Sequence, residues 1–312
     1  MTASPVSCPG CGGHEWVDVA PQDRSFILQT CAACGTCRID AGAAPPEALY
    51  RDYYAGDGAE RLSGVFNGIW KWLRHRKAAR LLAAIPERGR VLDVGCERGE
   101  LLSVLKAAGR HVNGTQLSQA AADFAKTHFD IDVFVGQLGD APYAAASFDA
   151  VLMINVLEHL PDPTAYLRLV HGLLRPGGVF WLEVPNAGSF TARTGAKRWL
   201  HHDPAHHLWN FTLPSLTQAT TRTGFTVEAS YHVSWEHGPI GCLQTWLNLL
   251  PGPRNVIFDI AKGGLSRKPG RLLLELGHAA IGAVLLPFAF IVATAESAAG
   301  NGQIMLVRLR KA

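Results

Sequence analysis

Four cysteines near the amino terminus have the spacing of a metal site. They form two Cys-x-x-Cys pairs, Cys8 with Cys11 and Cys31 with Cys34, and nineteen residues separate the pairs. Two thiolates at this spacing on a tight turn can occupy two corners of a tetrahedron, the geometry that zinc prefers. A module of about forty residues is also too small to fold without such a staple. The pattern predicts a structural zinc ribbon. Two redox-active pairs are the disfavoured alternative, because no strand–helix–strand pattern surrounds them.

A glycine-containing turn follows the first apolar stretch after residue 90. In residues 91–100 the chain passes from apolar side chains to Asp93, then through Gly95 and Gly99 into an expected helix that begins at Glu100. Glycines let the backbone approach a ligand closely, and a helix start presents free amide donors to a carboxylate. Ligands of open α/β sheets bind at the carboxyl ends of the strands. The run therefore predicts the cradle of a small-molecule cofactor.

This run resembles the first motif of class I S-adenosylmethionine-dependent methyltransferases, Asp-x-Gly-x-Gly-x-Gly, with Glu97 in place of the middle glycine. Residues 147–160 resemble the fourth-strand region of the same family, and residues 174–179 resemble the turn before its fifth strand. A nicotinamide-binding fold is disfavoured because its Gly-x-Gly-x-x-Gly spacing is absent. The resemblance implies S-adenosyl-L-methionine as the cofactor, in contact with Asp93, Gly95, Cys96, Gly99, Gln116, Gln137, Leu138 and Asn155.

Two of these positions depart from the family pattern. Gln116 stands where the family usually has an acidic residue that accepts both ribose hydroxyls, and Gln137 stands where an aspartate often faces the adenine amine. An amide oxygen can accept these protons, but it lacks the charge-assisted part of the bond, which is about twice as strong. We therefore expect reduced cofactor affinity or a compensating neighbour. Together with Glu97, these departures leave open a degenerate, non-catalytic methyltransferase-like scaffold.

Histidines are the candidate bases for a protic acceptor. Methyl transfer from a sulfonium mainly needs aligned reactants, and histidine titrates near neutral pH. His159 is the first candidate, because it follows the expected fourth strand beside Asn155 and Glu158, where the family's substrate meets the cofactor. His207 is the second, in the segment 201–209, which resembles a His-Leu-x-x-Phe-Thr element of related bacterial methyltransferases. This histidine cluster could instead bind a metal or hydrogen-bond its own loop.

The elements expected around these residues form a doubly wound α/β domain. From residue 90 onward, apolar stretches alternate with amphipathic ones, as in a parallel sheet covered by helices. A helix at about residues 64–84 precedes them, and its basic face of Arg74, Arg76, Lys77 and Arg80 is expected to be solvated. Helices are expected in the gaps between the first five strands. The strands are expected at 91–94, 111–115, 133–135, 150–154, 179–184, 226–233 and 304–308.

An apolar insert separates the last two expected strands. Residues 276–295 hold only two polar side chains, His278 and Thr294, and are long enough to span a bilayer. A single crossing is excluded because the following strand must return to the same sheet, and Pro287 favours a bent or re-entrant helix. We expect membrane contact, with a helical cap or a dimer contact as alternatives. Four basic residues that suit anionic lipid precede the run: Lys262, Arg267, Lys268 and Arg271.

The composition indicates a folded, rather apolar protein of 312 residues, 48% of them hydrophobic and 18% charged. A formal net charge of +3 is too small to indicate a nucleic-acid partner. The first residues carry neither a basic start nor an apolar run, so the protein is expected to be cytoplasmic, peripheral or re-entrant at the inner face of the membrane. Seven cysteines in a reducing compartment suit metal or chemistry better than disulfides.

We therefore expect a zinc ribbon at residues 1–42, a helical lead-in at 43–88, a Rossmann-like, seven-stranded methyltransferase core at 89–238, an apolar helical insert at 239–302 and a final antiparallel strand of the core sheet at 303–312. The resemblance implies methyl transfer to a small-molecule, sugar or lipid-linked acceptor, and the insert favours one held near a membrane. Ribosomal or transfer RNA methylation is the alternative reaction, although the insert and the modest charge argue against it. The sequence does not determine the oligomeric state.

Overall fold

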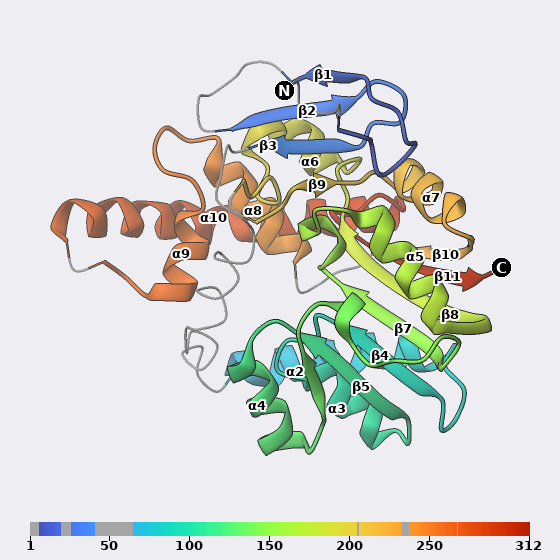
Figure 1. The fold of residues 1–312 in the computed structure, drawn as a ribbon. Coiled ribbons are helices and arrows are strands. Elements are labelled where there is room, and N and C mark those ends of the chain that lie inside the picture. The colour runs from blue at the N-terminus through green and yellow to red at the C-terminus, as the bar shows by residue number, and fades with distance from the viewer. Residues whose placement is uncertain (1–5, 20–25, 41–64, 205, 233–236, 267) are drawn as a thin grey trace.

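The protein contains a seven-stranded sheet and a smaller four-stranded sheet (Figure 1). The computed structural model describes residues 6–19, 26–40, 65–204, 206–232, 237–266 and 268–312. Residues 43–64 of the expected lead-in, together with Arg267, lie outside these residues.

The larger sheet has the strand order β10-β11-β8-β7-β4-β5-β6. Neighbouring strands are parallel, except that β11 is antiparallel to both β8 and β10. The expected Rossmann-like sheet with a final antiparallel strand is therefore confirmed. Its strands are β4 (Arg90–Val94), β5 (His111–Gln116), β6 (Val133–Val135), β7 (Phe148–Ile154), β8 (Leu174–Pro185), β10 (Phe225–Tyr231) and β11 (Ile304–Lys311).

Helices cover both faces of this sheet because its strands bury side chains on both sides. In β7, Ala150 and Leu152 pack on one face, whereas Val151 and Met153 pack on the other, and all four are fully buried. A parallel sheet covered on both faces requires such a continuous apolar run. The first face carries α2 (Val65–Leu82), α3 (Glu100–Ala107) and α4 (Gln119–Phe129), and the second carries α5 (Pro163–Leu173) and α7 (Leu213–Arg222) (Figure 1).

The connection between β6 and β7 differs from the expected helix. The chain makes only the short 3-10 turn Leu138–Asp140 there. Gly136, Gly139 and Pro142 interrupt this segment, and glycine and proline are the poorest helix formers. The gap is therefore a loop, which passes over the edge of the sheet beside the expected cofactor cradle.

Side-chain caps fix where three of the helices begin. The Ser118 hydroxyl accepts the Ala121 N–H at the start of α4, and the Asp162 carboxylate accepts the Ala165 N–H at the start of α5. Thr212 and Ser215 cap each other's backbone at the start of α7. Each such cap stabilises a helix by about 1 kcal/mol.

The small sheet joins the amino-terminal segment to the core. It consists of β1 (Trp16–Asp18), β2 (Ile27–Cys31), β3 (Cys37–Asp40) and the distant β9 (Trp209–Asn210), in that order. β9 pairs antiparallel with β3, and the Trp16 and Trp209 rings lie 6.1 Å apart. The ribbon and the larger domain are therefore hydrogen-bonded through a shared strand.

The apolar insert is helical, as expected. It contains α8 (Gly238–Asn248), α9 (Val256–Gly263) and α10 (Pro269–Ala298), and α10 runs unbroken through Pro287. Ala289 of α10 packs against Leu243 and Leu247 of α8. At the inner end of α10, the buried Glu296 carboxylate accepts hydrogen bonds from the N–H and the hydroxyl of Thr191. Thr191 belongs to α6 (Phe190–Gly195), so these bonds fix α10 onto the core.

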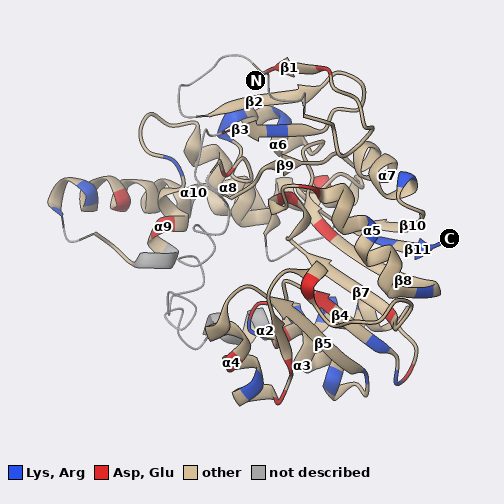
Figure 2. Ribbon diagram, in the orientation of Figure 1, with Lys and Arg blue, Asp and Glu red and all other residues tan. Residues whose placement is uncertain are grey.

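The outer face of α10 is apolar and exposed. Leu273 is 74% exposed, Val284 is 68% exposed and Ile291 is 65% exposed. Figure 2 shows charged residues at the outer end of this helix, whereas the long middle section carries none. Among the described residues, α10 is the one helix that is long and apolar enough to cross a membrane. Its 30 residues correspond to a length of about 45 Å.

Candidate active site and zinc centre

Two glycines shape the turn at the carboxyl end of β4. Gly95 and Gly99 have φ angles of 74° and 75°, in the left-handed region that favours glycine. A Cβ atom on Gly95 would lie 2.6 Å from the Val156 side chain, and one on Gly99 would lie 2.9 Å from the Ala125 Cβ. The amides of Gly95 and Cys96 both donate to the Thr115 carbonyl of β5. The turn is therefore held close to β5 and α4, and neither glycine has room for a side chain.

Asp93 lies beneath this turn and is almost inaccessible, with 4% of its surface exposed. Burial raises the pKa of its carboxyl group to about 8, and the charge of Glu97 acts in the same direction. The ammonium group of Lys77 opposes this rise. Without a ligand, Asp93 is therefore largely neutral near pH 7 and can donate as well as accept a hydrogen bond.

Gln116 occupies the end of β5 with one half of its amide unsatisfied. Its Oε1 accepts the N–H of the next residue, Leu117, at 2.6 Å. Its Nε2 is buried and has no hydrogen-bond partner among the residues that the structure describes. A buried donor without a partner is costly, and a ligand oxygen would satisfy it. We expected this amide to accept a hydroxyl proton, whereas in the structure its unsatisfied group is a donor. A ribose oxygen of the expected cofactor fits that group.

Gln137 and Leu138 lie on the other side of the cradle, after β6. The Tyr166 hydroxyl of α5 donates to Gln137 Oε1, so the oxygen expected to face an adenine amine already accepts one bond. A carbonyl oxygen has two lone pairs and can accept a second proton. Leu138 is buried and packs in the core cluster beneath β7. No pattern in the sequence pointed to Tyr166, which α5 brings to this position.

A polar network at the ends of β7 and β8 joins the cradle to α2. The Lys77 ammonium group lies 2.9 Å from Glu183 Oε1, and the amide of Asn155 donates to the same oxygen over 3.3 Å. The carboxylate of Glu183 is 3% exposed. The expectation of a solvated basic face on α2 is therefore wrong at Lys77, because the helix packs this side against the sheet. A lone charge in the apolar run of β8 was the signal that could have revealed Glu183.

His159 and His207 lie together at the carboxyl end of β7. His159 ends the 3-10 turn Leu157–His159, His207 precedes β9, and their ring centroids are 4.7 Å apart. His159 Nδ1 lies 2.9 Å from the His206 carbonyl, and His207 Nδ1 lies 2.7 Å from the His201 carbonyl. The structure thus brings together the two expected bases. The ring of His206 instead pairs with Asp203 at 2.8 Å.

Burial determines the protonation of this pair. Burial lowers the pKa of His159 to about 3, and the charge of His207 acts in the same direction. Burial also lowers the pKa of His207. Asp203 opposes the shift at His207. Both rings are therefore neutral near pH 7, and in each ring the nitrogen without a proton carries a lone pair. His159 is the weaker base of the two. The adjacent Glu158 is 1% exposed, and burial raises the pKa of its carboxyl group to about 8.

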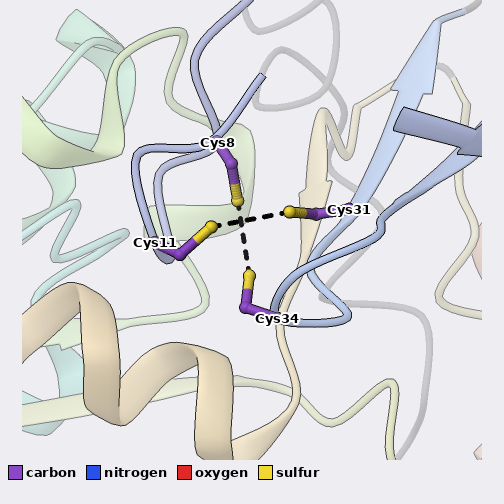
Figure 3. A group of neighbouring side chains, drawn as sticks. All are labelled: Cys8, Cys11, Cys31 and Cys34. Atoms are coloured by element: carbon purple, nitrogen blue, oxygen red, sulfur yellow. Dashed lines mark hydrogen bonds between the residues drawn. The ribbon is translucent and has the colours of Figure 1, made fainter. Parts of the chain in front are cut away.

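The four amino-terminal cysteines converge on one point (Figure 3). The sulfur atoms of Cys8 and Cys34 lie 3.5 Å apart, as do those of Cys11 and Cys31, and all four are within 4.8 Å of one another. Four thiolates at about 2.3 Å from a tetrahedral zinc would be separated by about 3.8 Å. Burial opposes ionisation of Cys34, but hydrogen bonds from Thr36 and neighbouring thiols outweigh it and lower the pKa of that thiol to about 7. This donor set fits a zinc ion.

The ribbon contacts the segment that carries His207. The Ile39 N–H of β3 donates to the Leu208 carbonyl, and the Leu208 N–H donates to the Glu158 carbonyl, both over 2.9 Å. The backbone between His207 and Trp209 is therefore held on one side by the ribbon and on the other by the turn after β7.

The comparisons with known proteins agree with this geometry. The family described as a methyltransferase domain matches residues 69–230. The ubiquinone biosynthesis O-methyltransferase of Xanthomonas axonopodis pv. citri (strain 306) is 35% identical over 148 residues, which cover 44% of this chain and 62% of that protein. The enzyme of the same description from Xanthomonas campestris pv. campestris (strain B100) is 35% identical over 145 residues, covering 43% of this chain and 61% of that protein. The chain thus spans about three fifths of the curated relatives it matches.

Solved structures show the same fold at low sequence identity. The [4+2]-cyclase SpnF superposes with a TM-score of 0.50 at 18% identity, covering 76% of this chain and 80% of that one. A chain from the complex between the Haloferax volcanii Trm112 methyltransferase activator and a methyltransferase superposes with a TM-score of 0.53 at 17% identity, covering 86% of this chain and 99% of that one.

Proposed function

This chain belongs to the class I S-adenosylmethionine-dependent methyltransferase family, and we propose that it methylates a small, lipid-soluble acceptor at a membrane surface. The observation that carries the membrane part of this proposal is the exposed apolar face of α10. Hydrogen bonds from Thr191 to Glu296 hold that helix on α6. α6 follows β8 in the chain, and Glu183 of β8 lies at the site. α10 is therefore attached beside the edge of the sheet where the acceptor would bind.

The cofactor side of the proposal uses the cradle around β4 and β5. S-adenosyl-L-methionine supplies an electrophilic methyl group on a positively charged sulfur when it is bound. Gly95, Cys96 and Gly99 would leave room for its backbone contacts, and Gln116 Nε2 would donate to a ribose oxygen. Gln137 and Leu138 would line the adenine side, with Asp93 beneath the turn and Asn155 toward the acceptor. The carboxylates of Glu97 and Glu183 near the turn suit a cationic cofactor.

The acceptor side uses the two histidines. We propose His207 as the group that takes the acceptor proton through Nε2, because its Nδ1 faces the His201 carbonyl. His159 would contact the acceptor beside it, since burial lowers its pKa too far for it to be an effective base. The neutral state of both rings near pH 7 suits these tasks.

The chemical class of the acceptor is part of the proposal. Relatives named for ubiquinone biosynthesis are O-methyltransferases, which supports a hydroxyl group as the site of methylation. The lipid-soluble character of the acceptor is inferred from α10. The four cysteines would hold one structural zinc ion and keep the ribbon folded.

Transfer of a labelled methyl group to a fractionated extract tests the proposal. The purified protein would be incubated with S-adenosyl-L-methionine carrying a labelled methyl group, together with a bacterial membrane-lipid extract, a water-soluble metabolite extract or a transfer RNA pool. We expect label in the organic phase of the lipid reaction, and we expect His207→Ala to lower its rate at least tenfold. Label in the RNA would favour the RNA alternative, and no label in any fraction would favour the non-catalytic scaffold.

A further inference from the structure

A buried carboxylate and two imidazoles meet beside the proposed acceptor site. Glu158 and His159 lie on the 3-10 turn after β7, and His207 comes from the loop before β9, about fifty residues away in sequence. One donor atom from each of the three side chains lies within 4.8 Å of the other two. Apart from the ribbon cysteines, this is the one such group of histidine, cysteine or acidic side chains found among the described residues.

Glu158 has no evident reason to be buried in the protein alone. Its exposed fraction is 1%, and neither carboxylate oxygen has a hydrogen-bond partner among the described residues. A buried carboxyl group with no partner costs free energy unless a proton, a cation or a metal ion satisfies it. No Lys or Arg forms an ion pair with Glu158 in the described part of the chain. Among the described residues, no side chain therefore binds this carboxyl group, which leaves it open to a proton or a metal ion.

Hydrogen bonds to the two histidines hold them as metal ligands usually are. Nδ1 of His159 faces the His206 carbonyl and Nδ1 of His207 faces the His201 carbonyl, at 2.9 Å and 2.7 Å. A carbonyl can only accept, so each Nδ1 carries the ring proton, and the lone pair of each ring is on Nε2. Metal-bound histidines almost always donate their second ring nitrogen to a carbonyl or carboxylate in this way.

The donor set indicates the class of ion. Two imidazoles and one carboxylate are the protein ligands of catalytic zinc sites, in which the fourth position is left for water or substrate. Magnesium and calcium prefer oxygen ligands and are disfavoured by two imidazoles. The four thiolates of the ribbon would fill a separate, closed zinc site, so the described residues offer two metal sites of different chemistry.

We propose that Glu158, His159 and His207 form a second metal site, which binds a divalent transition metal ion, with zinc as the best match. Its remaining position would take a water molecule or the hydroxyl group of the methyl acceptor. That second role rests on the proposed function, whereas binding of the ion does not. With the ion bound, His207 would act as a ligand, and the ion would lower the pKa of the bound hydroxyl group in place of a histidine base.

The ribbon gives this site a fixed geometry. Hydrogen bonds run from Ile39 to Leu208 and from Leu208 to Glu158, so the backbone next to His207 is tied to the backbone of the carboxylate ligand. Ligands from two loops would ordinarily need to be ordered when the ion binds, which lowers affinity. Here backbone hydrogen bonds join the two segments.

Metal stoichiometry and affinity test the proposal. The full-length protein would be saturated with zinc, freed of excess ion and analysed by mass spectrometry for metal content. We expect two zinc ions per chain in the wild type and one per chain in Glu158→Gln and in His207→Asn. We also expect each variant to lower the affinity for the second ion by at least about 100-fold in competition with a chelator, since loss of an outer-shell partner alone costs 10–100-fold.

Two further variants and a cobalt spectrum distinguish the proposed site from the rest of its loop and from the ribbon site. His206→Asn changes a histidine of the same loop that lies outside the group and should retain two ions, whereas Cys34→Ser should lose the ribbon ion. Cobalt(II) bound at the ribbon should show sulfur-to-metal charge transfer, which the second cobalt should lack. Circular dichroism and binding of S-adenosylhomocysteine report whether each variant is folded. A wild type with one ion per chain, or folded Glu158→Gln and His207→Asn variants with two, would overturn the proposal, whether or not methyl transfer occurs.

Discussion

At the scale of single residues, the turn after β4 combines a buried carboxyl group with two glycines that cannot be replaced without strain. Asp93 is held beneath the turn in surroundings that favour its neutral form. Gly95 and Gly99 combine left-handed backbone with close neighbours, Val156 and Ala125. These three residues give the cradle its shape before any ligand is bound.

Gly95→Ala should cost more stability than the same change at Gly109. Both glycines have positive φ angles, 74° and 84°, so each alanine carries the left-handed backbone strain of about 1–2 kcal/mol. Only at Gly95 does the new Cβ meet a neighbour, at 2.6 Å, and overpacking adds about 1–3 kcal/mol. Urea denaturation would measure the free energy of unfolding of both variants, and calorimetry would measure their S-adenosylhomocysteine affinity. Equal losses at the two positions would contradict the close packing of the turn.

The carboxyl group of Asp93 should make the ligand-free protein less stable as pH rises. Its pKa is about 8 in the folded chain against an ordinary value of 3.8, so the folded state binds an extra proton between these values. The neutral carboxyl group therefore contributes stability that is complete below pH 3.8 and is lost as pH rises to about 8. The free energy of unfolding falls over this range by up to about 1.4 kcal/mol per pH unit. Asp93→Asn should remove this slope from denaturation curves measured between about pH 5.5 and pH 8. Parallel curves for both proteins would show that Asp93 ionises normally.

The sequence predicted the residues of this site that belong to short motifs, and it missed those brought in by packing. Asp93, Gly95 and the four cysteines are recognisable because local spacing alone prescribes their geometry. Lys77 and Glu183 form their ion pair only because α2 packs against β8, 106 positions apart in sequence. His159 and His207 were predicted individually, but their contact depends on the hydrogen bond from the Leu208 N–H to the Glu158 carbonyl, which no local pattern indicates.

At the scale of elements, the ribbon is part of the site's framework. β9 is a strand of the ribbon sheet, and it begins two residues after His207. A zinc ion that folds the ribbon would therefore also hold the loop that carries His207.

Removal of one zinc ligand should loosen β9 without affecting the cofactor cradle. In Cys34→Ser we expect the amide of Asn210 in β9 to exchange hydrogen at least tenfold faster, because its pairing with Cys37 depends on a folded ribbon. S-adenosylhomocysteine affinity should stay within about twofold, since the cradle lies on the larger sheet. Hydrogen exchange with mass spectrometry measures the first effect. Cys37→Ser, which changes a cysteine of β3 outside the zinc group, is the control. Unchanged protection of β9 in Cys34→Ser would show that the zinc-bound ribbon does not hold the loop that carries His207.

The elements themselves were largely predictable, because alternating apolar and amphipathic stretches dictate a parallel sheet. The seven-stranded sheet, its final antiparallel strand and the helical insert follow the expectations. The connection between β6 and β7 was expected to be a helix and is a loop, because three helix-breaking residues there outweigh the usual alternation of strand and helix. The two-residue strand β9 was not expected either, since a pairing this short leaves no periodic signal.

At the scale of the whole molecule, α10 and the helices packed on it form an arm whose α10 side carries a large exposed apolar surface. The middle of α10 exposes apolar side chains, and charges gather at the outer end of that helix (Figure 2). Charged residues at the tip disfavour passage of the arm through a bilayer, whereas an orientation along the surface would bury the apolar face and leave the charges in water.

Acidic substitutions on this face should weaken membrane binding. The double variant Val284→Glu, Ile291→Glu replaces two side chains that are 68% and 65% exposed, so each glutamate should be tolerated by the fold. Loss of about 1.5–3 kcal/mol of burial for each side chain should reduce binding to phosphatidylglycerol vesicles at least tenfold in a sedimentation assay. Val17→Glu, at a ribbon position that is 58% exposed, is the matched control and should bind as the wild type does. Equal binding by all three proteins would remove the membrane from the proposed function.

Calorimetric titration with S-adenosylhomocysteine tests the central claim most directly. The cradle formed by Asp93, Gly95 and Gly99 should bind one molecule per chain with micromolar affinity in the wild type. We expect Asp93→Ala to abolish the heat of S-adenosylhomocysteine binding, while circular dichroism shows that the variant is folded. A folded wild type that binds no S-adenosylhomocysteine would contradict the assignment of the cradle, and the chain would then be a scaffold with a methyltransferase fold.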